Sequence, residues 1–498
     1  MQPLDIIVLI IYVILVTGFG CLFYRRSSDA EGFMLAHRRL PGWVVGLSIF
    51  GTYLSSISFL ALPGKAYMDN WSAFVFSLSL PFAAWVAARW FIPLYRATSD
   101  VSAYAYLERR FGLWARLYAM TFYLLTQLAR MGTIFFLVAL AMEQLTGWDL
   151  PTIIIVTGIL VTLYTVVGGI EAVIWTDAVQ SVILTLGALV SLATIIYLMP
   201  GGLDQIMSIA GETGKASLGS FAFSFTEQGF WLVMFYGIFI NLQNFGIDQS
   251  YVQRYKTAKS DADARRSVWI GALTYIPVSA LFLFLGTALF AFYQVNVGLL
   301  PEGLSGDQVF PHFIVHQLPA GLTGLVIAAL FAAAMSSADT SMNSSASLLM
   351  NDVYLRLLKP GADDAKQIRL LRAVTVVLGI LGTATALLMI SIKGALDTWW
   401  SLAGIFSGGM LGLFLLGVLS RRAQSFEAAT AVVIGVLVIS WASLSPGSEA
   451  WWANPFHSFM TIIIGTLTIF LGGVLLSRHR QRMGKGEPPR TLYDLNKL

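Results

Sequence analysis

LTGLVIAALFAAAMSSADTSMNSSA (residues 322–346) is the stretch that decides how the whole chain is interpreted. Its first half is apolar enough to enter a lipid bilayer. Its second half continues the same helical pattern with hydroxyl, amide and carboxylate side chains: Ser336, Ser337, Asp339, Thr340, Ser341, Asn343, Ser344 and Ser345. A helix in hydrocarbon tolerates such groups only where they face protein, water or an ion. The stretch therefore predicts a buried membrane helix with a polar function.

Three of these polar residues share one face of the helix. Ser336, Asp339 and Thr340 stand at positions i, i+3 and i+4. Hard oxygen ligands on one stripe of a buried helix suit a small cation, so the pattern predicts an ion site. The alternative is a packing seam, in which alanine and serine allow helices to approach closely. The carboxylate of Asp339 favours the ion site.

Composition places the chain among polytopic helical membrane proteins. Of its 498 residues 57% are hydrophobic and 12% charged, and the mean hydropathy is +0.73. A single cysteine excludes an intrachain disulfide and a thiolate metal cluster. The chain has no Walker A motif, so we do not expect ATP-driven pumping. So many spans also make nucleic-acid binding an unsuitable explanation for the basic loops.

We expect thirteen membrane spans. They lie at about 4–24, 42–67, 71–96, 116–143, 151–167, 171–199, 229–250, 267–294, 319–347, 370–392, 398–420, 427–443 and 457–477. Arginine and lysine gather in alternate loops, as in Arg109, Arg110 and Arg356, and the remaining loops contain few. The positive-inside rule then predicts an outside N-terminus and a cytoplasmic C-terminus in a bacterial plasma or inner membrane.

Two spans carry polar interruptions at mid-membrane depth. The second contains Gly51, Thr52, Ser55, Ser56 and Ser58, and the seventh contains Gly237, Asn241, Gln243, Asn244 and Gly246. The two runs are about 185 residues apart, and each would open a set of five spans. Paired broken helices at corresponding places predict an inverted-repeat transporter whose unwound carbonyls are ligands. The alternative is a pair of unrelated glycine kinks.

This interpretation divides the chain into six parts. Residues 1–40 form an extra N-terminal helix and a cytoplasmic loop, 41–200 the first five-helix repeat, and 201–228 an extracellular loop. Residues 229–422 form the second repeat, 423–477 two C-terminal helices, and 478–498 a cytoplasmic tail.

Buried charges give further candidates for function. Arg130 lies about fourteen residues from either end of its span, or about 20 Å at helical rise, too deep to snorkel. It could pair with Asp177 or Asp339, or its planar fork could bind a substrate carboxylate. Asp177 could instead be a carboxylate at a helix N-terminus. We interpret Asp248 and Arg254, at the cytoplasmic end of the seventh span, as a gate or a structural ion pair.

No catalytic constellation is visible in the sequence. The five histidines lie in loops or at span ends, and no Ser/His pair shares a depth in the membrane. We therefore do not expect an enzyme. We expect an aromatic belt at the membrane–water interface to include Trp71, Trp399 and Trp400.

Several segments resemble the sodium:solute symporter family, which has a LeuT-type 5+5 inverted-repeat fold. The most specific are GGIEAVIWTDAVQ (168–180), DQSYVQRY (248–255), AAAMSSADTSMNSS (332–345) and AYLERRF (105–111). Within the family, LSSISFLALPGKAYMDNW, LARMGTIFFL and FINLQNF are similar to segments of bacterial sodium/sialic acid symporters. The resemblance covers nearly the whole chain.

The resemblance implies residues for each site. One sodium site would use Gly51, Leu54, Ala333, Ser336 and Ser337, and a second would use Asp177, Ser336, Asp339 and Thr340. Substrate contacts would be made by Ser55, Ser58, Ser77, Arg130 and Phe239. Asp339 replaces a serine of the family pattern, and Ser77 replaces a glutamine.

These expectations describe a sodium-coupled symporter that imports an anionic sugar such as N-acetylneuraminate by alternating access. The partners are the small solute, sodium and the lipid bilayer, with no organic cofactor, nucleic acid or protein partner. A neutral sugar or a small monocarboxylate is the alternative substrate. A solute-sensing membrane receptor is the alternative of another class.

Overall fold

A computed structural model describes residues 2–23, 29–391, 395–445 and 452–482. In this part of the chain the regular structure is helical, apart from one isolated bridge between Leu40 and Ala258. The helices are α1 (Pro3–Cys21), α2 (Ala30–Leu35), η2 (Ala36–Arg38), α3 (Gly42–Tyr53), η3 (Ile57–Ala61), α4 (Leu62–Met68), η4 (Trp71–Ala73), α5 (Phe74–Leu78), α6 (Leu80–Val86), η5 (Ala87–Phe91), α7 (Ile92–Arg96), α8 (Ala105–Phe111), α9 (Leu113–Thr146), α10 (Leu150–Leu198), α11 (Gly202–Glu212), α12 (Phe230–Ile247), α13 (Gln249–Thr257), α14 (Asp261–Val295), α15 (Gly306–Gln317), α16 (Leu322–Leu348), η6 (Leu349–Leu358), α17 (Asp364–Leu388), α18 (Ala395–Leu419), α19 (Ser425–Leu444) and α20 (Met460–Arg482).

The predicted spans coincide with apolar helical segments. Eleven helices of the described residues are long and apolar enough to cross a membrane. The bent pair Gly42–Tyr53 and Ile57–Met68 adds one more, and a shorter apolar helix covers Leu150–Leu163. Most of the predicted tail, residues 483–498, lies outside the described residues.

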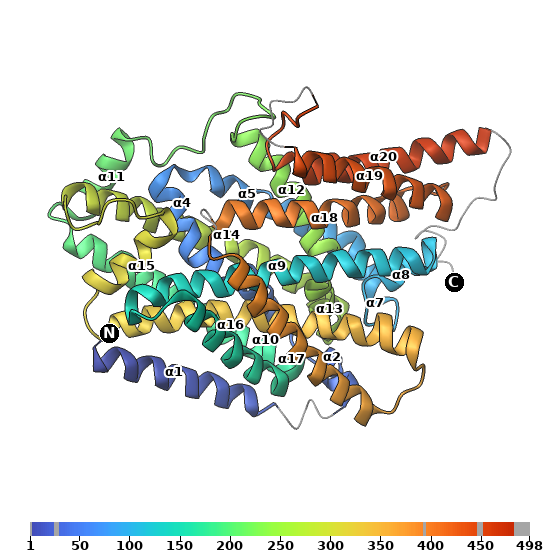
Figure 1. Ribbon diagram of the computed structural model, residues 1–498, viewed down its shortest axis with the longest axis horizontal. Coiled ribbons are helices and arrows are strands. Elements are labelled where there is room, and N and C mark those ends of the chain that lie inside the picture. Colours follow the sequence, from blue (N-terminus) through green and yellow to red (C-terminus); the bar gives the residue numbers. More distant parts are fainter. Residues whose placement is uncertain (1, 24–28, 392–394, 446–451, 483–498) are drawn as a thin grey trace.

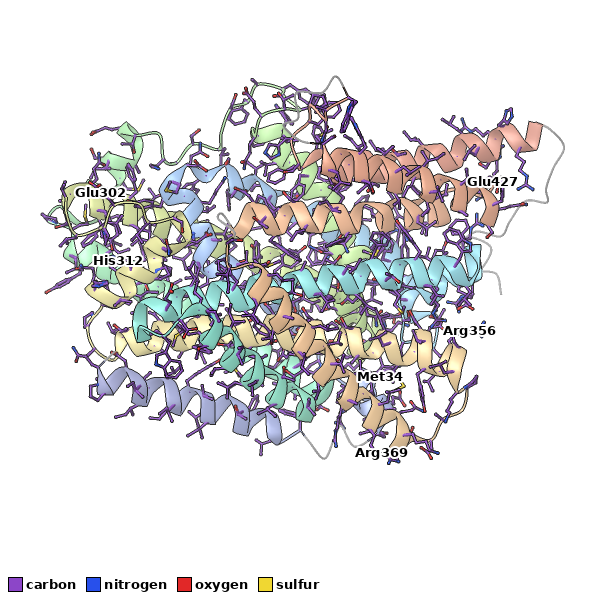
Figure 2. The ribbon with its side chains drawn as sticks, in the orientation of Figure 1. Met34, Glu302, His312, Arg356, Arg369 and Glu427 are labelled. Carbon is purple, nitrogen blue, oxygen red and sulfur yellow. The ribbon has the colours of Figure 1, made fainter. Side chains whose placement is uncertain are left out.

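The bundle has two distinct ends, since most long helices run along its longest axis (Figure 1). Figure 2 shows Glu302 and His312 at one end and Arg356 at the other. We call these the Glu302 end and the Arg356 end. Helix α1 begins at the Glu302 end, and α20 finishes at the Arg356 end. The two termini of the described bundle therefore lie at opposite ends.

The break predicted in the second span is confirmed. Helix α3 ends at Tyr53, and Leu54 has φ −88° and ψ 88°, outside the helical range. The Oγ of Ser55 accepts a hydrogen bond from the N–H of Ile57 at 3.2 Å, a local side-chain-to-backbone bond at the start of the next segment. The two halves meet at a bend of 56°. Side-chain hydroxyls thus replace helical hydrogen bonds where the chain unwinds.

The break predicted within the polar run of the seventh span lies later. Helix α12 continues through Gly237 and Gly246 to Ile247, and the backbone turns at Asp248, with φ −70° and ψ 125°. The amide of Asn241 is satisfied across the bundle, donating to Ser79 Oγ at 2.8 Å and accepting from Tyr53 at 2.7 Å. The polar run therefore binds neighbouring helices and has no need to open the backbone.

The fifth and sixth predicted spans correspond to the two apolar halves of α10, Leu150–Leu163 and Gly169–Leu198. A kink at Gly169, with φ 62° and ψ 179°, separates the two halves. That region of conformational space is readily open to glycine alone. The interruption explains why the sequence reads as two apolar segments around this position.

Helix α16 lies at the centre of the bundle and packs against α9, α10 and α3. On its α9 face Ser341 donates to Gln127 Oε1 at 2.7 Å, and Ser344 is 2.7 Å from the Tyr123 hydroxyl. On this face the hydroxyls therefore link α16 to α9 by side-chain hydrogen bonds. The face toward α10 carries Ser336, which contacts Asp177.

Candidate functional site

A cavity opens where the second span is broken. It encloses about 820 Å³ of space free of atoms, its open mouth included. Its walls come from the break itself and from α4, η4, α5, α9, α12, α13, α14 and α18. The lining residues are Tyr53, Ser55, Ile57, Ser58, Leu62, Ala73, Phe76, Ser77, Thr126, Gln127, Arg130, Tyr236, Ile240, Gln243, Asn244, Asp248, Tyr251, Tyr275, Trp399, Trp400, Ala403 and Ser407.

Arg130 places a cation in the wall of this cavity. The side chain is 8% exposed, and its Nη2 donates a hydrogen bond to the carbonyl oxygen of Thr52, at the broken end of α3. Among the described residues no carboxylate lies within ion-pair distance of Arg130. The predicted pairing with Asp177 is wrong, because Asp177 pairs with Arg254 at 2.8 Å. The guanidinium therefore offers charge and donors to the cavity.

Two further polar atoms of the cavity wall are buried without a hydrogen-bond partner in the described structure. They are Gln243 Nε2 and Ser407 Oγ. A buried polar group without a partner carries a desolvation penalty. A polar solute in the cavity would remove that penalty by accepting from Gln243 and bonding to Ser407. Both atoms therefore point to a ligand with several polar groups.

Aromatic rings form another part of the wall. Phe76 stacks on Trp400 with ring centroids 5.1 Å apart and planes at 24°, and Trp400 is buried. The prediction that Trp399 and Trp400 belong to an interfacial belt is wrong, since both line the cavity. Sequence alone cannot separate the two roles, because both place a tryptophan near a span end.

Asp248 is the second charged residue of the wall. Its Oδ1 accepts from the N–H of Ser250 at 2.8 Å and from its hydroxyl at 2.5 Å, which caps α13. Gln127 Nε2 donates to Oδ2 at 3.4 Å, and the charge of Arg130 acts on this carboxylate from across the cavity. The predicted partner of Asp248, Arg254, makes its ion pair with Asp177 instead.

The cavity brings together most of the predicted substrate contacts. Ser55, Ser58, Ser77 and Arg130 all line it, although they come from three separate stretches of sequence. Ser58 Oγ lies 3.4 Å from the Tyr275 hydroxyl, and Ser77 Oγ accepts from Ser279 at 2.8 Å. Phe239 is not among the lining residues. It is half-buried and packs against the hydrophobic core.

The residues predicted for the first sodium site lie on elements that pack together. Gly51 is in the last turn of α3, whose carbonyls have no further helical partner, and Leu54 is the C-cap. Ala333, Ser336 and Ser337 lie in α16, which packs against α3. The hydroxyl of Ser337 is buried and has no hydrogen-bond partner in the described residues. An unpartnered buried hydroxyl beside freed carbonyls suits a small hard cation.

The residues predicted for the second sodium site form a dense network. Asp177 Oδ1 accepts from Ser336 Oγ at 2.6 Å, and Oδ2 accepts from Ser48 Oγ at 2.5 Å and Arg254 Nη2 at 2.8 Å. The same nitrogen donates to Thr340 Oγ1 at 2.6 Å. Asp177 is completely buried within α10, so its interpretation as a carboxylate at a helix N-terminus is wrong.

The two predicted sodium sites are neighbours. A side chain at Gly51 would meet Ser181 Oγ at 2.5 Å and the backbone oxygen of Asp177 at 3.2 Å, so α3 and α10 touch at this point. Asp339 is also completely buried, and its charge acts on Tyr12 of α1. In the described chain no three His, Cys, Asp or Glu side chains gather as around a transition metal. The first site offers hydroxyl and carbonyl oxygens, and the second offers two carboxylates and two hydroxyls.

Ion pairs close the bundle at both ends. At the Glu302 end, Lys65 of α4 pairs with Asp397 of α18 at 2.9 Å. At the Arg356 end, Glu108 of α8 pairs with Arg116 and Arg356, each at 2.7 Å. The hydrogen bond from Arg356 holds the pKa of Glu108 below its ordinary value. Helices of different parts of the chain are thus tied together at each end.

Several functional residues were missed by reasoning from the sequence. Gln127 lies one helical turn before Arg130, and this i, i+3 spacing could have placed it in the same cavity. No sequence pattern placed Tyr275 or Trp399 in the cavity, because the neighbours of their helices are determined only by tertiary packing. The partner of Asp177 was also missed, since Arg254 follows the chain break at Asp248.

Comparisons with known proteins agree with this geometry. The family model described as sodium:solute symporter family matches residues 33–435. The sodium/sialic acid symporter NanT of Aliivibrio fischeri is 33% identical over 472 residues, covering 93% of this chain and 92% of its own. The sodium/sialic acid symporter SiaT of Proteus mirabilis is 33% identical over 453 residues, covering 90% and 91%.

Solved structures extend the likeness to the fold. A Na+-coupled sialic acid symporter, in a substrate-bound outward-open state that revealed a novel Na+ site, has a TM-score of 0.90 and 30% identity, covering 99% of this chain and 100% of its own. Mhp1, a nucleobase-cation-symport-1 family transporter, has a TM-score of 0.60 at 17% identity, covering 91% and 95%, which shows the fold alone. The predicted LeuT-type fold is confirmed.

Proposed function

The chain belongs to the sodium:solute symporter family, and from this premise we propose that it imports an anionic sugar, N-acetylneuraminate, together with sodium. The observation that carries the proposal is Arg130. A guanidinium in a cavity wall, with no ion-pair partner among the described residues, favours a ligand that brings a carboxylate.

The remainder of the cavity suits a sugar that carries many hydroxyls and an amide. Ser55, Ser58 and Ser77 offer hydroxyls, while Gln243 and Asn244 offer amides. The rings of Phe76 and Trp400 offer an apolar face, on which the carbon skeleton of a sugar ring packs well. Two sodium/sialic acid symporters at 33% identity support the same solute.

Sodium is proposed to bind first beside the cavity, at Gly51, Leu54, Ala333, Ser336 and Ser337. The unpartnered hydroxyl of Ser337 supports this position. The ion would bind where α3 is unwound. It would thereby stabilise the backbone conformation of the break in which Ser55 and Ser58 face the solute. A second ion is proposed at Asp177, Ser336, Asp339 and Thr340.

We propose that alternating access uses the ion pairs at the two ends as gates. We propose that the Arg356 end, with its basic loops, lies on the cytoplasmic side of the cell membrane. The N-terminus would then lie outside the cell. Opening the Lys65–Asp397 pair admits solute and sodium, and opening the Glu108 network releases them. Each positive charge that moves inward across 100 mV contributes about 2.3 kcal/mol.

A small monocarboxylate is the second candidate, since human sodium-coupled monocarboxylate transporter 1 is 28% identical over 425 residues. It would use the same Arg130 clamp but leave most of the polar cavity wall without partners. Competition separates the two candidates. Lactate in excess would block uptake by a monocarboxylate carrier and leave uptake of a sialic acid carrier largely unchanged.

The test is uptake of labelled N-acetylneuraminate into proteoliposomes, with and without an inward sodium gradient. We expect accumulation that depends on the gradient and that unlabelled N-acetylneuraminate, but not its methyl ester, suppresses. Absence of uptake, in protein that sodium stabilises against heat, would reject the solute and retain the sodium coupling. If the protein neither takes up the solute nor is stabilised by sodium, sodium symport is rejected.

A further inference from the structure

Arg254 is a fully buried cation at the centre of the second ion site. It lies on α13, is 0% exposed, and donates to oxygens of four helices. Its Nη2 bonds to Asp177 and Thr340 at 2.8 and 2.6 Å, its Nε to Ser48 at 2.8 Å, and its Nη1 to the Ser250 carbonyl at 2.9 Å. Each of its three nitrogens therefore has an acceptor.

The position of Nη2 is the decisive feature. This single nitrogen bridges Asp177 and Thr340, two of the four residues proposed to hold the second sodium ion. A sodium ion that bound Asp177 Oδ2 and Thr340 Oγ1 together would compete with Nη2, which already bonds to both oxygens. In this conformation a cation of the protein therefore occupies two of the oxygens proposed for the second sodium ion.

Electrostatics lead to the same conclusion. Asp177 and Arg254 neutralise each other in an interior where neither side chain reaches solvent. Adding sodium to the same carboxylate would place two cations within contact distance in a low dielectric, where their repulsion is strong. One of the two must leave.

We propose that Arg254 is a tethered cation that competes with sodium for Asp177, so that the Arg254–Asp177 contact and the second sodium ion exclude each other. This rests on the proposed sodium coupling. When sodium has left toward the cytoplasm, Arg254 returns to Asp177. The empty carrier then reorients without a bare carboxylate in its interior, which would be strongly unfavourable.

The competition is tested by measuring sodium binding without any solute. Purified protein in detergent is heated in mixtures of sodium and choline chloride at constant ionic strength, and the half-maximal stabilising sodium concentration is recorded. Arg254→Gln keeps hydrogen-bonding groups but removes the charge. We expect this concentration to fall about tenfold, the change that about 1.4 kcal/mol of lost competition produces. An unchanged or higher value would overturn the proposal.

Two variants control for charge and for general damage. Arg254→Lys retains a tethered cation. Its half-maximal sodium concentration should stay within about threefold of the wild-type value, which in free energy is about half of the tenfold effect expected for Arg254→Gln. Arg480→Gln removes a different paired arginine, which bonds to Glu427 at 2.8 Å and joins α20 to α19 outside the proposed sites and gates. It should leave the half-maximal sodium concentration unchanged. A sodium shift in Arg480→Gln equal to that in Arg254→Gln would overturn the assignment to Arg254.

A measurement on the wild type keeps the proposal testable if Arg254→Gln does not fold. Hydrogen–deuterium exchange of peptides covering α13 is compared in sodium and in choline. Release of Arg254 should make α13 exchange faster in sodium, and slower or equal exchange would overturn the proposal. If sodium neither stabilises the wild type nor alters exchange anywhere, the sodium coupling itself fails, which is a different outcome.

Discussion

Two buried arginines of this molecule have opposite surroundings. Arg130 contacts one backbone carbonyl and faces the cavity, with no carboxylate within ion-pair distance among the described residues. Arg254 has four acceptors, one of them the carboxylate of Asp177. Both arginines lie where desolvation of a charge is costly. The protein compensates Arg254 from within, and under the proposed function the solute would compensate Arg130.

The difference shows how to assign a role to a charge inside a membrane. A buried charge that already has its counter-ion belongs to the architecture or to a switch, and removing its partner should damage stability. A buried charge without a counter-ion belongs to ligand binding, and removing it should damage function while stability is retained. The predictions below test this distinction.

The largest effect is expected at Arg130. Arg130→Ala and Arg130→Lys should lower uptake of a carboxylate solute at least a hundredfold, because the charge-assisted bonds lost are worth about 1.5–3 kcal/mol each. The lysine variant keeps the charge but cannot form the bidentate contact. Initial uptake rates in proteoliposomes measure the effect. Arg89→Ala, at an exposed arginine of the same bundle, is the matched control and should transport normally. Undiminished affinity in both Arg130 variants would refute the carboxylate clamp.

The second effect concerns stability at the other arginine. Asp177→Asn leaves the guanidinium of Arg254 buried without its counter-ion, a loss of about 3–5 kcal/mol for a buried pair. We expect its melting temperature in choline to fall well below that of Arg130→Ala. Thermal unfolding in detergent, followed by intrinsic fluorescence, gives the comparison. Equal melting temperatures for the two variants would remove the distinction between the arginines.

Substitution of Asp339 should have a smaller effect, on the number of sodium ions coupled to uptake. Its position at i+3 from Ser336 supports a role in the second sodium site, and Asp339→Ala should lower the sodium Hill coefficient of uptake toward 1. Asp339→Asn is the matched variant of similar volume and should behave in the same way. A Hill coefficient equal to that of the wild type in both variants would remove Asp339 from the site.

A separate effect, on the pH dependence of stability, is expected at Lys256, on the same short helix as Arg254. Burial lowers the pKa of Lys256 from about 10.5 to about 7, although its ammonium donates to the carbonyls of Thr98 and Asp100. Between those two pH values the unfolded chain holds a proton that the folded chain has lost. Stability should therefore rise as the pH increases from about 7 to about 10.

Lys256→Met should abolish that rise, and melting curves across this pH range would measure it. Lys259→Met, three residues further along at an exposed position, is the control and should retain the pH dependence of the wild type. An identical pH dependence in the wild type and Lys256→Met would show that the ammonium keeps its proton in the fold.

Much of the fold was predictable because it depends on local properties. Hydropathy located the spans, and the polar run from Gly51 to Ser58 located the break, since side-chain hydroxyls there compete with helical hydrogen bonds. The same reasoning misplaced the break of the seventh span. Asn241 bonds to side chains of distant helices, and no local rule could show that the backbone of α12 remains helical there.

The sequence by itself determined that the chain is a helical membrane protein with a charged residue, Arg130, and a hydroxyl stripe deep in the bilayer. These follow from composition and helical period, which are properties of neighbouring residues. Only the tertiary structure decided which buried charges meet. Asp177 lies 77 positions from Arg254 and 47 from Arg130 in the chain, and packing brings the more distant arginine to it. A counter-ion is chosen by distance in space, because electrostatic attraction depends on separation and dielectric and not on order along the chain.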